Sequence, residues 1–251
     1  MNEITCSATG LRLVGAAAEN GLRISKTLYG ASSALERLDV DPRQGWHRWD
    51  TPGWTLYYSE TPEAAFAETI ACFRLTVAQR STLQDLADLW QMPVSDLIAA
   101  LDEEADELGL PHVGVVHSSW RQLRTLYTVQ LPATGWWVDP LHAGTIAAVE
   151  QAIGSHALGE LGITTGLTLS HLTSDQRELT TLVAEHIRAA QLHDGSAPLG
   201  IRFPSKWGFG PCWAYWSTTD PASLTVIAAE PVDPDNPSLQ AIAAAFGLLI
   251  V

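Results

Sequence analysis

The chain has 251 residues, enough for one large domain that buries a substantial apolar core without help from a disulfide or a metal. Its formal net charge of −14 at pH 7 argues against nucleic-acid partners, because binding to phosphates depends on clustered Lys and Arg. The three cysteines, Cys6, Cys72 and Cys212, are far apart and outside any CxxC pair, so we expect free thiols in a reducing compartment.

The N-terminus has no basic residue before Arg12 and therefore lacks the charged start of a secretory signal. The longest apolar stretch, near residues 241–251, is too short to cross a bilayer. We expect a cytoplasmic protein with no membrane partner.

Residues 54–59, Trp-Thr-Leu-Tyr-Tyr-Ser, are typical of a strand, and Pro52-Gly53 before them is typical of a tight turn. A helix should follow at once, with Thr61 as its cap and Pro62 at its first position. It should continue to about Phe73.

Residues 81–120 contain no Lys or Arg, and leucines recur there at helical spacing. The pattern predicts a small acidic helical insert over residues 81–110. A similarity of this segment to a helix-turn-helix is superficial, since a DNA reader needs basic residues.

Further along the chain, Thr173-Ser-Asp-Gln176 has the spacing of a capping box for a helix whose apolar stripe includes Leu179, Val183 and Ile187. Other predicted elements are strands at 124–131, 200–203, 212–216 and 224–229, a helix at 144–153, and a terminal helix from Asn236-Pro237. Strands and helices do not alternate regularly, which favours one mixed-sheet α+β domain over residues 1–251.

Several common functional motifs are absent from the sequence. It contains no Gly-x-Gly-x-x-Gly after a strand, no Gly-Lys-Ser/Thr phosphate loop and no Gly-x-Ser-x-Gly elbow. The eight histidines form no helical metal-binding pair, and the spacing of His112 and His117 does not mark them as ligands. We therefore expect no metal and no bound cofactor.

Glu68 is the one charged residue between Ala64 and Phe73, in a run of Ala, Phe, Ile, Cys and Thr. Such a carboxylate is expected to face the interior or a cleft, where it must be paired or used. A structural ion pair with an arginine is the alternative to a functional role.

Together, Arg48-Trp49-Asp50, Tyr57, Thr61 and Glu68 form a pattern that resembles the RES-domain family. The resemblance spans roughly residues 21–217 and leaves the acidic insert as an addition. It implies an ADP-ribosyltransferase-like fold and an NAD-consuming toxin that is paired with an Xre-type antitoxin.

The resemblance also suggests further site residues. The family's first arginine best matches Arg23, with Arg12 as a rival. The family's serine best matches Ser205 in Gly200-Ile-Arg-Phe-Pro-Ser205, with the region 178–181 as a competing location.

These residue types suit NAD chemistry. Arg23 and Arg48 can hold a pyrophosphate through bidentate hydrogen bonds, and the ring of Tyr57 can stack on nicotinamide. Glu68 can stabilise the positive charge that develops on the ribose as the glycosidic bond breaks. Arg48 could instead stack on its tryptophan neighbours, Tyr57 could belong to the core, and Ser205 could only satisfy a turn.

The resemblance implies hydrolysis or phosphorolysis of the nicotinamide–ribose bond, with NAD as substrate. ADP-ribosyl transfer to a protein would use the same cleft, and a non-catalytic interaction module that keeps the fold is a rival from another class. The sequence leaves the acceptor and the oligomeric state, including a homodimer, open.

Overall fold

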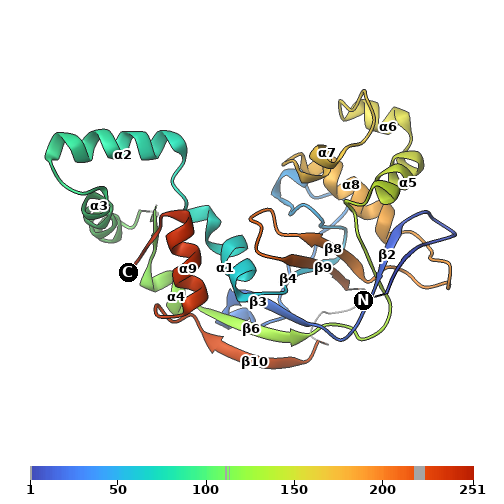
Figure 1. Cartoon of the computed structure of the whole chain (residues 1–251), viewed down its shortest axis with the longest axis horizontal. Coiled ribbons are helices and arrows are strands. Elements are labelled where there is room, and N and C mark those ends of the chain that lie inside the picture. The colour runs from blue at the N-terminus through green and yellow to red at the C-terminus, as the bar shows by residue number, and fades with distance from the viewer. Residues whose placement is uncertain (1, 111, 113, 218–223) are drawn as a thin grey trace.

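A computed structural model describes residues 2–110, 112, 114–217 and 224–251. Among these residues, nine strands form one sheet in the order β1-β2-β7-β8-β9-β4-β3-β6-β10, and a separate parallel pair joins β5 to β11 (Figure 1). β7 and β8 run parallel, while the other neighbours in the large sheet are antiparallel. The predicted mixed-sheet α+β class is therefore confirmed.

The strands are β1 (Glu3–Thr5), β2 (Arg12–Gly15), β3 (Asn20–Lys26), β4 (Trp54–Ser59), β5 (Val115–Val116), β6 (Arg124–Gln130), β7 (Trp136–Val138), β8 (Gly200–Pro204), β9 (Pro211–Ser217), β10 (Val226–Pro231) and β11 (Leu249–Ile250). The helices are α1 (Pro62–Ile70), α2 (Val77–Trp90), α3 (Val94–Leu108), α4 (Ser118–Gln122), α5 (Ala143–Ile153), α6 (Ser155–Glu160), α7 (Leu169–Thr173), α8 (Arg177–Arg188) and α9 (Pro237–Phe246).

The segment from β4 to α1 forms as its local signals predict. β4 has the predicted bounds, and the Thr61 side chain accepts a hydrogen bond from the Ala64 amide at the start of α1. The helix ends at Ile70, and a short 3-10 turn continues to Phe73. Pro62 at the first turn fixes the direction in which α1 leaves the sheet.

The predicted capping box at Thr173–Gln176 is wrong. Thr173 is the last residue of α7, and α8 begins at Arg177 with no capping hydrogen bond from the Gln176 side chain, which donates to the Leu161 carbonyl instead. The Thr173 hydroxyl instead donates to the Leu169 carbonyl within α7, so it cannot cap the next helix. The apolar stripe of α8, including Leu179, Val183 and Ile187, is buried as predicted.

Two helices occupy most of the acidic segment. α2 begins with a capping box between Thr76 and Gln79, and Gln91 ends it in the left-handed conformation. α2 and α3 share a small core that includes Leu83, Leu97 and Ile98. They lie at one end of the molecule, while α5, α6, α7 and α8 lie at the other (Figure 1).

The alternation of β4 places neighbouring side chains on opposite faces of the large sheet. Leu56 and Tyr58 join a core that contains Trp137 and Trp213. Tyr57 packs instead against the core beneath α8. The face that carries Tyr57 therefore becomes the floor of the candidate site.

The three cysteines are free thiols, as predicted, and Cys6 and Cys212 are buried. Within the described ranges, none of the helices combines the length and apolar character needed to span a membrane.

A side chain added at Gly200 would clash with the backbone of the neighbouring strand. The φ of Gly200 is +154°, and an added Cβ would lie 1.9 Å from the Ala214 carbonyl oxygen on β9. We predict that Gly200→Ala lowers the free energy of unfolding by about 3 kcal/mol or more, because two backbones would have to separate. Urea unfolding of the purified variant measures the loss.

Gly45→Ala is the matched control, since nothing lies within 4 Å of the added Cβ and its φ is not in the left-handed region. Equal stability of the two variants would contradict the close contact between β8 and β9.

Candidate functional site

A pocket of about 730 Å³ opens on the Tyr57 face of the sheet. Its walls come from β3, the loop before β4, β4, α1, the start of α8 and the β8–β9 connection. Four predicted site residues line it, namely Arg23, Arg48, Tyr57 and Glu68. The fold therefore brings together side chains from four separate segments of the chain.

Glu68 lies on the exposed side of α1 and faces the pocket. Of the two expected environments, interior and cleft, it occupies the cleft. In the described part of the chain, no Lys, Arg or His forms an ion pair with it, so the structural ion pair considered from the sequence is not observed there.

Ser205 connects the β8–β9 turn to this carboxylate. Its buried hydroxyl donates a 2.7 Å hydrogen bond to Glu68 Oε1 and accepts one of 3.1 Å from the Trp207 amide. Ser205 does not itself line the pocket. It holds Glu68 in one orientation, while Oε2 makes no hydrogen bond to any described residue.

The Tyr57 hydroxyl is fully engaged by the protein. It donates to Asp50 Oδ1 at 2.9 Å and accepts from the Trp49 amide at 3.0 Å. Burial, followed by the charge of Asp50, raises the pKa of Tyr57 well above its ordinary value. The hydroxyl therefore stays protonated near neutral pH, and the ring is the part of Tyr57 left to contact a ligand.

Two aromatic contacts hold that ring in place. The His47 ring meets it edge-on with centroids 5.4 Å apart, and the Phe203 ring does so at 6.5 Å. Because both neighbours contact the ring in edge-to-face geometry, Tyr57 is fixed by packing as well as by its hydroxyl.

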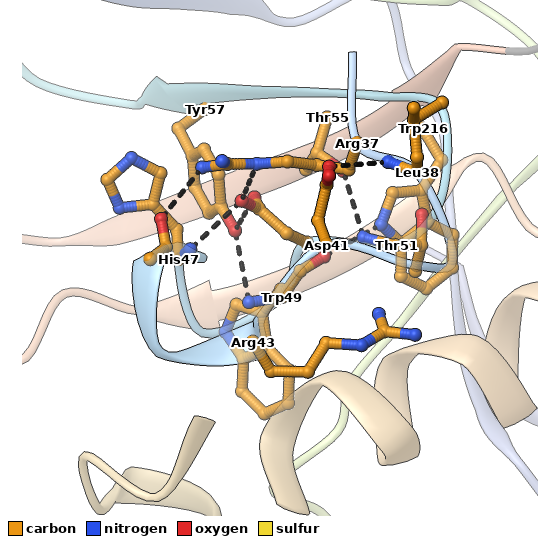
Figure 2. A network of polar contacts seen from close by, with 12 residues as sticks. Arg37, Leu38, Asp41, Arg43, His47, Trp49, Thr51, Thr55, Tyr57 and Trp216 are labelled. Carbon is orange, nitrogen blue, oxygen red and sulfur yellow. Dashed lines mark hydrogen bonds and ion pairs between the residues drawn. The ribbon is translucent and has the colours of Figure 1, made fainter. Parts of the chain in front are cut away.

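Asp50 accepts hydrogen bonds from three residues that are labelled in Figure 2, namely Arg37, His47 and Tyr57. Its buried carboxylate accepts from Arg37 Nε at 3.1 Å, the His47 amide at 2.9 Å and the Tyr57 hydroxyl at 2.9 Å. These bonds fold residues 47–50 back against β4. The orientation of the backbone that carries Arg48 therefore depends on Asp50, which does not itself line the pocket.

The same loop is also attached to the helices. Arg43 forms an ion pair with Glu185 on α8, and Gln44 donates to Glu178 at 2.7 Å. Arg48 Nη2 donates to the Thr173 carbonyl at 3.0 Å. The backbone that carries Arg48 is thus held from two sides.

Arg48 is half-buried, and its Nε has no hydrogen-bond partner among the described residues. Burial lowers its pKa, and the nearby charge of Arg177 lowers it further. Arg177 is itself paired with Asp175 at 3.0 Å, and Asp175 and Glu68 partly offset its effect on the pKa of Arg48. Two guanidinium groups in one pocket wall still form a place where an anion would be stabilised. The cations over the Trp46 ring are Arg43, 3.8 Å from its centroid, and Arg37 at 5.7 Å, rather than Arg48.

Arg23 reaches the pocket from β3. Its Nη2 donates to the Ser33 carbonyl at 2.5 Å, while Nη1 is buried with no hydrogen-bond partner in the described ranges. Burial lowers its pKa, partly offset by interaction with the Tyr58 hydroxyl. Arg23 therefore lies beside Tyr58 and Ser33, on the face of the sheet opposite Tyr57, and borders the pocket from there.

Sequence reasoning missed two further cations in the pocket wall, Arg177 and Lys206. Arg177 is the first residue of α8, and the misplaced capping box hid its position. Lys206 lies 5.1 Å from the Trp207 ring centroid. It directly follows Ser205 in the sequence, and this adjacency to a predicted site residue could have marked it as a candidate.

The alternative positions considered for the site lie elsewhere. Arg12 is on β2 and pairs with Glu3 at 2.6 Å, outside the pocket wall. Thr180 and Thr181 are buried within α8, and Glu178 binds Gln44. None of these residues lines the pocket.

The pocket concentrates positive charge in an acidic protein. Among the described residues, its lining includes Arg23, Arg48, Arg177 and Lys206 but only one carboxylate, that of Glu68. A flat aromatic ring and a single acid among several cations suit a ligand that carries both anionic groups and an aromatic base.

No protein-family model, curated protein or solved structure matches the chain.

We predict that Asp50→Asn lowers the free energy of unfolding by about 2 kcal/mol or more. The change leaves the Arg37 charge unpaired in a largely buried position and removes an acceptor that the network uses. Urea unfolding measures the loss. Asp85→Asn on the exposed face of α2 is the control, and an equal, small effect in both variants would contradict a central role for Asp50.

Proposed function

We propose that this protein cleaves the nicotinamide–ribose bond of NAD. The observation that carries the proposal is the pocket that combines Arg48, Arg177 and Arg23 with the Tyr57 ring and a serine-bound Glu68. We further propose that the chain is an ADP-ribosyltransferase-like RES domain with α2 and α3 as an insert. In that role it is a toxin neutralised by an Xre-type antitoxin.

The proposed binding mode follows from charge and shape. A volume of about 730 Å³ falls within the range of pockets that accept small-molecule ligands. Arg48 and Arg177, which repel each other without a ligand, hold the pyrophosphate between them, and Arg23 supplies a further donor. The Tyr57 ring packs against the nicotinamide.

The proposed chemistry centres on Glu68. Its Oε2 accepts a hydrogen bond from a ribose hydroxyl while Oε1 remains bound to Ser205. As the bond from ribose C1′ to the nicotinamide nitrogen breaks, the electron pair leaves with nicotinamide and positive charge builds on the ribose. A fixed carboxylate stabilises that charge more strongly than it stabilises the ground state. In this scheme Ser205 is a positioning residue.

The acceptor completes the reaction by attacking C1′ and losing a proton to solvent. Water gives ADP-ribose, phosphate gives ADP-ribose 1″-phosphate, and a protein side chain gives an ADP-ribosylated protein. Identifying the second product, after incubation with NAD in the presence and absence of phosphate, separates these alternatives. A non-catalytic module would release no nicotinamide at all.

We predict that Arg48→Lys raises KM about tenfold and changes kcat little. Lysine keeps the charge but loses the planar fork, a cost of about 1.5 kcal/mol for one charge-assisted hydrogen bond. Steady-state nicotinamide release gives both constants. Arg80→Lys on the exposed part of α2 should leave KM unchanged, and an unchanged KM in the Arg48 variant would remove Arg48 from the binding site.

We predict that Glu68→Gln lowers kcat about a hundredfold and leaves NAD binding nearly intact. Glutamine has almost the same shape but cannot stabilise the developing ribosyl cation, which is worth about 3 kcal/mol. Nicotinamide release and NAD titration on the same preparation measure the two effects.

Thermal unfolding of the Glu68 variant separates chemistry from structure. A purely structural Glu68 would give a lower Tm with normal turnover in the folded fraction, and that outcome would end the catalytic assignment. Glu36→Gln, an exposed substitution outside the pocket wall, is the control for a general effect of losing one negative charge.

A further inference from the structure

A group of side chains that could bind a metal ion lies outside the pocket, where α3 leads toward β5. Asp102 and Asp106 are one turn apart on α3, and His112 and His117 follow on the connecting chain. One ligand atom each from Asp102, His112 and His117 lies within 4.8 Å of the others. The sequence spacing of Asp102, His112 and His117 does not predict the cluster, because these residues meet only after α3 ends at Gly109.

His112 is oriented by a carboxylate. Its Nδ1 lies 2.6 Å from Oδ1 of the buried Asp102. The carboxylate can only accept this hydrogen bond, so Nδ1 carries the proton and Nε2 presents a lone pair. A carboxylate bound to the far nitrogen of an imidazole is the usual support of a metal-binding histidine.

Nε2 of each imidazole lies near the same carboxylate, that of Asp106. Asp106 Oδ1 lies 3.9 Å from His112 Nε2 and 4.0 Å from His117 Nε2, too far for hydrogen bonds. Ligands at about 2.0–2.2 Å from a tetrahedral ion lie about 3.3–3.6 Å apart, so the Asp106 carboxylate must shift inward by about half an ångström for its part in sharing one ion. The Asp106 side chain is 65% exposed and can make that shift.

The two rings stack with centroids 4.0 Å apart and planes inclined by 5°. Parallel planes do not aim both lone pairs at one point, so binding requires the His117 ring to turn about χ2, a broad torsion. His117 Nδ1 accepts a 3.2 Å hydrogen bond from the Ser119 amide at the start of α4 and lies 2.8 Å from the Ser119 hydroxyl. Binding an ion through Nε2 therefore moves the ring proton to Nδ1, which gives up the amide contact and donates to the hydroxyl instead.

The surrounding charge favours a cation. The helix α3 carries five acidic residues between positions 102 and 107, and the chain has no Lys or Arg from residue 81 to residue 120. The carboxylates of this segment therefore lack neighbouring basic residues along the chain. A divalent ion would reduce their mutual repulsion.

We propose that Asp106, His112 and His117 bind a zinc-class divalent transition-metal ion, with Asp102 orienting His112. Two imidazoles and a carboxylate suit zinc better than calcium or magnesium, which prefer oxygen ligands alone. The ion joins α3 to the chain that enters β5 and so fastens the α2–α3 pair to the rest of the molecule. Three protein ligands leave the fourth tetrahedral position to a water molecule. The proposal does not depend on the function proposed for the pocket.

Titration of the full chain with Zn²⁺, followed by calorimetry, tests the proposal. We expect one equivalent to bind with micromolar or tighter affinity, and equal concentrations of Mg²⁺ to give no binding. Asp106→Asn is the sharpest variant, since the exposed side chain makes no hydrogen bond to another described side chain. It should keep the Tm of the metal-free protein and weaken Zn²⁺ binding at least about tenfold.

His112→Asn and His117→Asn should weaken binding to the same degree or more. His156→Asn is the matched control, because His156 also faces a carboxylate, Glu160 at 3.6 Å, but is 93% exposed on α6. Zn²⁺ should raise the Tm of the wild type and of the His156 variant only. Equal affinity of the wild type and the Asp106 and His112 variants, or an equal loss in the His156 variant, would overturn the site.

Discussion

The buried carboxylate of Asp50 is the constraint on which the candidate site depends. A charge removed from water is tolerated only when donors surround it, and Arg37, the Tyr57 hydroxyl and the His47 amide provide them. Satisfying that single group fixes both the Tyr57 ring and the loop that carries Arg48. The pocket is therefore prepared by contacts behind it as much as by the residues that line it.

The pocket itself gathers several cations around the carboxylate of Glu68. Arg48 and Arg177 repel each other, and Arg23 retains an unused buried donor within the described ranges. Arrangements of this kind cost free energy in the absence of a ligand and recover it when an anion binds. Glu68, held by Ser205, is the one acidic group placed to act on such a ligand.

Local signals were sufficient where structure is determined by neighbours in the sequence. The alternation of Trp54–Ser59 and the Thr61 cap gave β4 and the start of α1, so the relative placement of Tyr57 and Glu68 could be predicted. The boundary between α7 and α8 could not, because the Thr173 hydroxyl bonds backward to Leu169 rather than forward to the next helix. The motif Thr173–Gln176 alone does not show that the Thr173 hydroxyl will bond to Leu169 in preference to capping α8.

Contacts between distant segments were harder to foresee. Ser205 was nominated, but its partner lies 137 positions away, and only the pairing of β8, β9 and β4 brings the two together. Arg177 reaches the pocket wall from the start of α8, an element distant in sequence from β4 and α1. The meeting of Asp102 with His112 depends on how the chain turns after α3, and side-chain spacing along a sequence carries no information on such a turn.

The contrast between the cationic pocket and the net charge of −14 has a kinetic consequence. At low ionic strength the whole protein repels an approaching anion at long range, although the pocket attracts it once it arrives. Physiological salt shortens the range of charge interactions to about 8 Å, which screens the distant repulsion more than the contacts inside the pocket. The net charge of the whole molecule therefore lowers the association rate of an anionic ligand, while the arginines of the pocket set its dissociation rate.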